Sequence, residues 1–228
     1  MALMLIALLL ALLLGPQLWV RRVLATYREP AERYASCGTG ADFARHLLAR
    51  HDLGTVTVET TALGDHYDPG ARSVRLLPLH HDGRSLAAVT IAAHEVGHAL
   101  QHAEGSVLFA WRQRLASLAM GAERASALLL LVAPVLVLLT RAPQVGLLCV
   151  ILAVTAALLG TLVHLVTLPV EWDASFARAL PLLEQGGHLY PSDLPHARRI
   201  LRAAALTYVA SSAASLLNVW RWLAILRR

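Results

Sequence analysis

Four stretches of this chain are almost purely apolar, and its polar residues lie between them. Residues 2–20, 125–140, 142–170 and 203–220 contain no Asp, Glu, Lys or Arg. The first is long enough to cross a hydrocarbon core of about 30 Å as a helix. It has neither the basic start nor the small-residue cleavage site of a secretory signal, so we expect residues 1–20 to be an uncleaved transmembrane anchor.

The two central apolar stretches predict a transmembrane hairpin over residues 125–170, because only Arg141 and the Ala142-Pro143 turn separate them. The last stretch contains three serines and an asparagine, and the sequence leaves open whether this C-terminal apolar helix, residues 203–228, crosses the membrane. Arginines lie mainly on the side of the polar segment: Arg21, Arg22, Arg28, Arg112, Arg114 and Arg124, against Arg141 at the hairpin turn. The positive-inside rule then places the polar segment in the cytoplasm.

The polar segment, residues 21–124, alternates between helical and strand-like patterns. Thr39 is a candidate cap for a helix over residues 41–50, whose apolar residues share one face. Residues 55–61 alternate like a strand, and residues 73–77 form a second candidate strand after the turn Asp68-Pro69-Gly70. Residues 86–100 then form a helix, with Ser85 or Asp82 as its cap. We expect a mainly helical α+β membrane protein, with a small sheet beside this helix.

Composition agrees with a membrane protein, because 57% of the 228 residues are hydrophobic and 15% are charged. All 20 basic residues are arginines and the net charge is +5. Since they cluster beside apolar segments instead of forming one basic stripe, they favour lipid headgroups over nucleic acid as a partner. Cys37 and Cys149 fall in a polar and an apolar segment, which predicts two free thiols.

The candidate chemistry lies in the segment His94-Glu95-Val96-Gly97-His98. Two imidazoles four residues apart on a helix share a face and can bind one Zn²⁺, while the adjacent glutamate is placed to act on a metal-bound water. A catalytic zinc usually has three protein ligands and one open position. The pattern therefore predicts a hydrolase, with Glu95 as general base and one further ligand elsewhere.

Several side chains can be compared as that third ligand. An extended HExxHxxGxxH pattern needs Gly at 101 and His at 104, but the residues there are Gln101 and Glu104. His102 is one turn beyond His98, and three imidazoles along one straight helix cannot close around a tetrahedral ion. Glu171 follows the hairpin, which returns the chain to the side it left, whereas Glu123 directly precedes an apolar segment. Glu171 is favoured, with Glu123 as the alternative.

Three segments together resemble a known family: the pentad at 94–98, Asp65-His66-Tyr67-Asp68-Pro69, and Leu168-Pro169-Val170-Glu171-Trp172-Asp173-Ala174-Ser175. They are similar to the YugP-type neutral zinc metallopeptidases of bacteria over most of the chain. More distantly the chain resembles the HtpX-like membrane gluzincins, in which a Glu-x-x-x-Asp segment after a transmembrane hairpin supplies the third ligand. The resemblance implies Glu171 as that ligand. The aspartate of that pattern falls on Ser175 here, which leaves open whether Asp173 supports the site instead.

These observations predict a membrane-anchored zinc metallopeptidase of a bacterial cell membrane, multi-pass, that acts on peptides or proteins. Zn²⁺ held by His94, His98 and Glu171 would polarise the peptide carbonyl, and Glu95 would remove a proton from water. His66 and Tyr67, on the loop between the two strands, are candidate donors to the developing oxyanion.

Two rival classes remain for comparison. Cleavage within the bilayer is disfavoured, because polar residues bound the motif helix on both sides. A non-catalytic protein with a structural metal would close all four zinc positions with Cys or His. The expected organisation is an anchor (1–20), a metallopeptidase domain (21–124), a transmembrane hairpin (125–170), a segment with the third ligand and helices that complete the domain (171–202), and the C-terminal helix (203–228).

Overall fold

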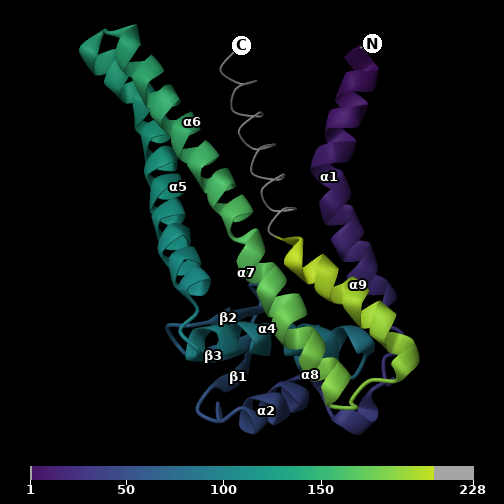
Figure 1. The fold of residues 1–228 in the computed structure, drawn as a ribbon. Helices are drawn as coiled ribbons and strands as arrows, with labels where there is room; N and C mark the ends of the chain where they lie inside the picture. The colour runs from purple at the N-terminus through teal and green to yellow at the C-terminus, as the bar shows by residue number, and fades with distance from the viewer. Residues whose placement is uncertain (1, 208–228) are drawn as a thin grey trace. The chain divides into compact units, whose positions relative to one another are not determined.

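The computed structural model describes residues 2–207; it does not describe the side chains of residues 2–13, 123, 126, 130, 143, 157–162 and 164–166. The chain is mainly helical with one small sheet, so the predicted α+β class is confirmed (Figure 1). In chain order the elements are α1 (Ala2–Thr26), the 3₁₀-helix η1 (Ala35–Cys37), α2 (Gly40–Arg50), β1 (Thr57–Thr60), β2 (His66–Asp68), β3 (Ser73–Leu76), α3 (Pro78–His81), α4 (Leu86–Ala103), α5 (Val107–Thr140), α6 (Pro143–Val166), α7 (Leu168–Trp172), the π-helix η2 (Asp173–Ala179), α8 (Leu180–Gln185), the 3₁₀-helix η3 (Pro191–Asp193) and α9 (Leu194–Ala205).

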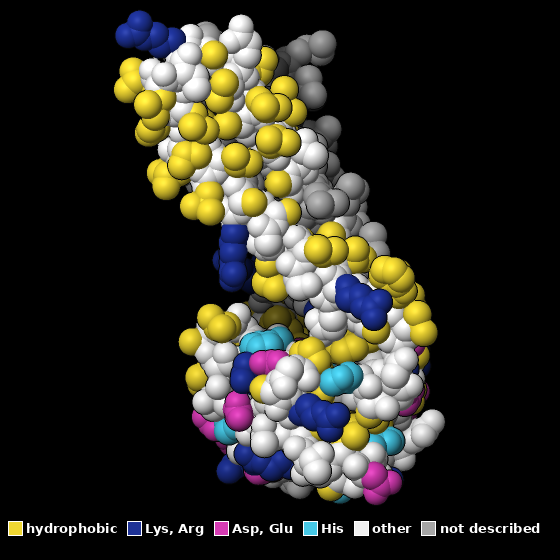
Figure 2. Space-filling model, turned by 90° about the vertical axis from the view of Figure 1, so that its left-hand side faces the viewer, with side chains coloured by type: hydrophobic (Ala, Val, Ile, Leu, Met, Phe, Trp, Pro, Cys, Tyr) yellow, Lys and Arg dark blue, Asp and Glu magenta, His cyan; other side chains and the backbone are white. Residues whose placement is uncertain are grey.

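The described residues form two compact units. One contains residues 2–17 and 111–168, and the other contains Leu18–Ala110 and Pro169–Thr207. The second unit, called here the polar unit, combines segments before and after the predicted hairpin. Charged and histidine side chains gather on its surface, whereas hydrophobic side chains cover the face of α5 and α6 drawn in Figure 2.

Local capping signals form the helices of the polar unit as predicted. Thr39 and Asp42 make a reciprocal capping box at the start of α2, and the Ser85 hydroxyl accepts the backbone N–H of Ala88 at the start of α4. At the end of α1, Val20 and Val23 pack into the hydrophobic core of the polar unit. The helix thus continues past the predicted end of the anchor and contributes its last turns to this core.

The sheet has three strands in the order β1-β3-β2, with β1 parallel and β2 antiparallel to β3. The prediction that His66 and Tyr67 lie on a loop is wrong, because both belong to β2 and pair with Arg75 and Val74 of β3. The Asp68 carboxylate accepts the backbone N–H groups of residues 70 and 71 and closes a tight turn between the two strands. Three residues are too few to show a strand pattern in the sequence, so pairing with β3 determines that they form a strand.

Helix α4 is the centre of the polar unit. It packs against α2, α3, α9, the π-helix η2 and strands β2 and β3, and all residues from Leu86 to Gln101 are buried. An apolar helix enclosed on every side needs no lipid to cover it. The motif histidines therefore lie on a helix that is buried within the polar unit.

Helix α6 and the part of α5 from Trp111 onward belong to the other unit, and the two helices run side by side in opposite directions (Figure 1). An added Cβ at Gly146 would lie 2.7 Å from a methyl group of Val137, so the two helices approach closely there. Helix α5 begins at Val107, well before the predicted start of the hairpin at residue 125; no proline separates the two positions.

By length and hydropathy, no single helix among the described residues qualifies as a membrane span. Two parts of α5, Val107–Leu129 and Leu131–Thr140, qualify together as a span bent by 45°. The transmembrane anchor and hairpin remain predictions, as do the domain boundaries. Most of the predicted C-terminal helix, residues 208–228, lies outside the described residues.

Candidate metal centre

Helix α4 and the π-helix η2 approach each other at Gly97, the fourth residue of the pentad. A Cβ added at this glycine would lie 2.6 Å from the carbonyl oxygen of Ala174, closer than real Cβ contacts. Only glycine permits this distance between the two backbones. The close approach brings Glu171 and Ser175 against the face of α4 that carries both motif histidines.

The three predicted zinc ligands converge where α4 and η2 come close to each other. The Oε2 atom of Glu171 lies 3.1 Å from Nε2 of His98 and 3.4 Å from Nε2 of His94. All three side chains are at least 95% buried. Among the described residues they form the one group of three or more His, Cys, Asp or Glu side chains whose ligand atoms lie within 4.8 Å of one another.

The donor set fits a zinc ion. Zinc binds imidazole nitrogen and carboxylate oxygen at about 2.0 Å, so neighbouring ligand atoms of a tetrahedral site lie about 3.3 Å apart. The observed separations of 3.1 Å and 3.4 Å bracket this value. Burial by itself would raise the pKa of Glu171, but positive charge at His98 and His94 outweighs burial and holds that pKa well below its ordinary value; a zinc ion bound to the neutral imidazoles would supply the same positive charge. The carboxyl group is therefore ionised, as a metal ligand must be.

Ser175 fixes the tautomer of His94. Its hydroxyl oxygen lies 3.0 Å from Nδ1 of His94 and 3.2 Å from the backbone carbonyl of Leu201. A carbonyl only accepts, so the single hydroxyl hydrogen goes to Leu201 and Nδ1 of His94 donates to the serine oxygen. The lone pair of His94 then lies on Nε2, which faces Glu171.

The departure from the Glu-x-x-x-Asp pattern is explained by this contact. Ser175 occupies the position of the aspartate and supports His94 directly, whereas Asp173 accepts a hydrogen bond from the side chain of Gln101. The Gln101 side chain in turn contacts Nδ1 of His98 at 2.9 Å. No role was predicted for Gln101 from the sequence, although its spacing of three residues from His98 was a usable signal.

The predicted catalytic side chains occupy different surroundings. Glu95 lies on α4 beside His94 and is 5% exposed. The Tyr67 hydroxyl lies 2.9 Å from Nδ1 of His102, and the His66 ring lies 2.8 Å from the backbone carbonyl of Gly64. The roles predicted for these three residues remain predictions. The side chain of Glu123, the alternative ligand, lies outside the described part of the structure.

Asp65, in the upstream segment that carries the resemblance, has a structural role. One of its carboxylate oxygens accepts the backbone N–H of Leu77, and the other lies 2.8 Å from Nδ1 of His80, which is buried. These contacts connect the start of β2 to α3, which precedes the motif helix. The segment therefore holds the sheet in place beside α4.

Comparison with known proteins agrees with this geometry. The model of the "Putative neutral zinc metallopeptidase" family matches residues 1–227. The chain is 35% identical over 216 residues to "Putative membrane protease YugP" of Bacillus subtilis (strain 168), covering 93% of this chain and 92% of that protein. No solved structure gives a significant match. With a match over nearly its whole length and a buried His-His-Glu group at the expected positions, the chain belongs to the neutral zinc metallopeptidase family.

Proposed function

We propose that this protein is a membrane-anchored zinc metallopeptidase that hydrolyses peptide bonds, with His94, His98 and Glu171 as the zinc ligands and Glu95 as the general base. The proposal rests on the convergence of the three buried side chains, with Glu171 Oε2 at the separation expected of zinc ligands from both histidine Nε2 atoms. The family to which the chain belongs supports zinc as the metal.

Glu95 and the residues around the zinc position each have a defined role in this reaction. Zinc, when bound, supplies a Lewis acid that polarises the peptide carbonyl and activates water. Glu95 accepts the proton of the attacking water and passes it to the leaving amine, a contribution worth about 10²–10⁴-fold in rate. Ser175 accepts the Nδ1–H of His94 and orients its ring, so that Nε2 faces the zinc position as a ligand.

The number of ligands favours catalysis over a structural metal. A structural zinc site is normally closed by four Cys or His side chains, whereas the group found among the described residues has three members, one of them a carboxylate. A fourth position is then available for water or substrate. This is the observation that ranks the peptidase above the non-catalytic alternative.

Tyr67 is the better placed of the two candidate oxyanion donors. Its side chain is buried and points its hydroxyl at His102, one helical turn beyond His98. To donate to a substrate oxyanion, the Tyr67 hydroxyl would exchange its contact with His102 for one with the substrate. The His66 ring instead contacts the backbone carbonyl of Gly64, two residues earlier in the chain, whereas the contact of Tyr67 is with the motif helix.

Membrane anchoring is supported by the surface of the unit that contains α5 and α6. Large apolar side chains are exposed along both helices, among them Leu131, Val135, Leu138, Leu139, Leu147 and Leu148. Exposed apolar surface of this extent marks an interaction with lipid or another protein. The relative in Bacillus subtilis is named as a membrane protease, and the arginine distribution favours a cytoplasmic polar unit.

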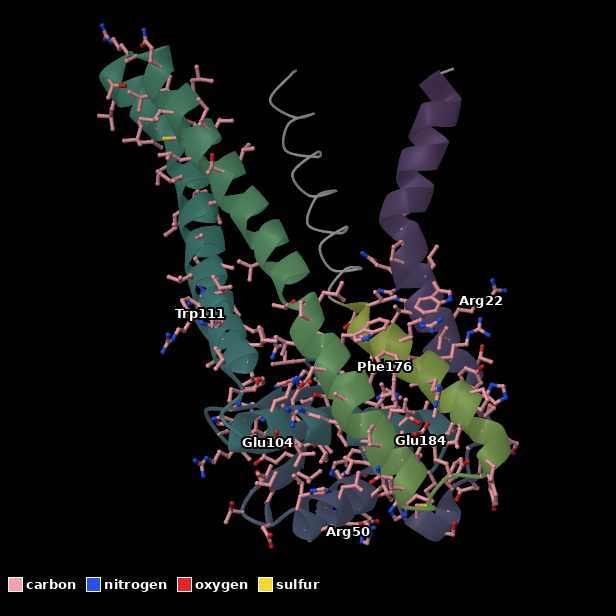
Figure 3. The ribbon with its side chains drawn as sticks, in the orientation of Figure 1. Arg22, Arg50, Glu104, Trp111, Phe176 and Glu184 are labelled. Atoms are coloured by element: carbon pink, nitrogen blue, oxygen red, sulfur yellow. The ribbon has the colours of Figure 1, made fainter. Side chains whose placement is uncertain are left out.

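A set of three variants tests the proposal on the purified full chain. Glu95→Gln should keep one zinc per chain, measured by metal analysis, and lose hydrolysis of a fluorogenic peptide. Glu171→Ala should lose both zinc and activity. Glu184→Gln, on α8 (labelled in Figure 3), removes a carboxylate that is ion-paired with Arg198 and is not among the proposed ligands, so this variant should retain both. Hydrolysis that survives in Glu95→Gln would contradict the assigned base, and zinc without any hydrolysis in the wild type would favour the structural alternative.

A further inference from the structure

Gln101 is a fully buried amide at the end of α4, and its polar atoms make three contacts. Its Oε1 lies 2.9 Å from Nδ1 of His98. Its Nε2 lies 2.8 Å from the backbone carbonyl oxygen of Val170 and 2.7 Å from the Asp173 carboxylate. Burial of an amide is costly unless its hydrogen bonds are made, and here both ends of the amide are bonded.

These contacts decide which end of the amide faces the histidine. The carbonyl oxygen of Val170 only accepts hydrogen bonds, so the amide nitrogen must be the end that faces it. The amide oxygen therefore faces His98, and Nδ1 of His98 must donate to it. The consequence is that the lone pair of His98 lies on Nε2, which points at Glu171.

A connected series of charged side chains orients the Gln101 amide. The Asp173 oxygen that accepts from Gln101 also accepts from Nε of Arg178 at 2.8 Å, and the same guanidinium contacts Glu104 at 2.7 Å. Glu104 lies at the C-terminal end of α4 with its side chain 58% exposed (Figure 3). The connection thus runs from a buried histidine to the surface.

The π-helix η2 makes this series of contacts possible. Residues five apart on an α-helix point about 140° away from each other. In a π-helix the hydrogen bonds join residues five apart, so Asp173 and Arg178 of η2 lie on the same side. Their contact at 2.8 Å depends on this local change of helix type.

We propose that Gln101 is a positioning residue of the zinc site, which holds His98 in the tautomer that binds metal and is itself oriented by Asp173, Arg178 and Glu104. The inference rests on the proposed function, since it assumes that His98 binds zinc. Partners of this kind on metal-binding histidines are worth about 10–100-fold in metal affinity. Ser175 on His94 and Gln101 on His98 then form a matched pair of supports, both uncharged.

Zinc affinity of the full chain, measured by competition with a chromophoric chelator, tests the inference. Gln101→Met keeps the approximate volume and removes all three hydrogen bonds, and we expect it to bind zinc about 10–100-fold more weakly than the wild type. Thr90→Val is the control, because it removes a buried hydroxyl from the same helix outside the chain of contacts. It should bind zinc as the wild type does.

Two additional measurements separate positioning from a general loss of structure. The absorption spectrum of the cobalt-loaded protein should change in Gln101→Met and not in Thr90→Val, since it reports ligand geometry. Arg178→Met, which changes a residue nearer the surface, should fold even where Gln101→Met does not, and should weaken zinc binding by a smaller factor.

Equal zinc affinities and cobalt spectra in the wild type, Gln101→Met and Arg178→Met would overturn the inference and leave the proposed function intact. Absence of zinc binding in the wild type would overturn both.

Discussion

Gly97→Ala tests the close approach on which the metal centre depends. The new Cβ would lie 2.6 Å from the carbonyl oxygen of Ala174, whereas ordinary contacts begin at 3.4 Å. Helix α4 and the π-helix η2 would have to separate by about 0.8 Å, and neither backbone can rotate away as a flexible side chain would. Glu171 and Ser175 would move with η2, away from both histidines.

The magnitude follows from two opposing effects. Overpacking of this kind costs about 1–3 kcal/mol of unfolding free energy. Replacing a helical glycine with alanine contributes about 1 kcal/mol in the other direction. Gly121→Ala, on α5 with no atom within 4 Å of the added Cβ, has the second effect without the first. We therefore expect Gly97→Ala to be about 1–3 kcal/mol less stable than Gly121→Ala.

The assay combines denaturant unfolding with zinc competition and peptide hydrolysis. A displacement of close to 1 Å within a catalytic site can reduce activity about 100-fold, so we expect weaker zinc binding and a loss of that order in Gly97→Ala. Gly121→Ala should keep wild-type zinc affinity and activity. If Gly97→Ala matched Gly121→Ala in stability, zinc affinity and activity, the contact between α4 and η2 would not determine the site.

Three further predictions concern the supports of the site and of the fold. Ser175→Ala removes the acceptor that orients His94, and chelator competition should show zinc binding about 10–100-fold weaker. Removal of zinc should lower the melting temperature and its return should restore it, because zinc at 1,000 times its Kd stabilises the folded state by about 4 kcal/mol. Asp193→Asn should cost about 1–3 kcal/mol at pH 7, since the buried Tyr34 hydroxyl loses its carboxylate partner. The hydrogen bond from Arg33, followed by that from Tyr34, holds the pKa of Asp193 below its usual 3.8 against the effect of burial, so this stability is present above about pH 4 and is lost as the pH falls through the lower folded-state value. Denaturation curves would contradict that pH dependence if the difference in unfolding free energy between the wild type and Asp193→Asn were the same at pH 7 and at pH 3.

Local features of this protein are determined by the sequence alone. The pentad on a helix places His94 and His98 on one face because the α-helical repeat depends on neighbouring residues only. The caps at Thr39 and Ser85 act within one helical turn, and both are confirmed. The family was also predictable, because the three motifs and the order of apolar and polar segments are legible without coordinates.

Contacts between distant segments were decided only by the tertiary structure. The place of His66 and Tyr67 in a strand depends on pairing with β3, and the support of His98 by Gln101 depends on Val170 and Asp173, about seventy residues away. Position 97 requires glycine because the backbone of Ala174 lies against it, and no sequence pattern around the pentad indicates that contact. Helix periodicity selects which atoms face outward from α4, but the packing of η2 against it selects which atoms they meet.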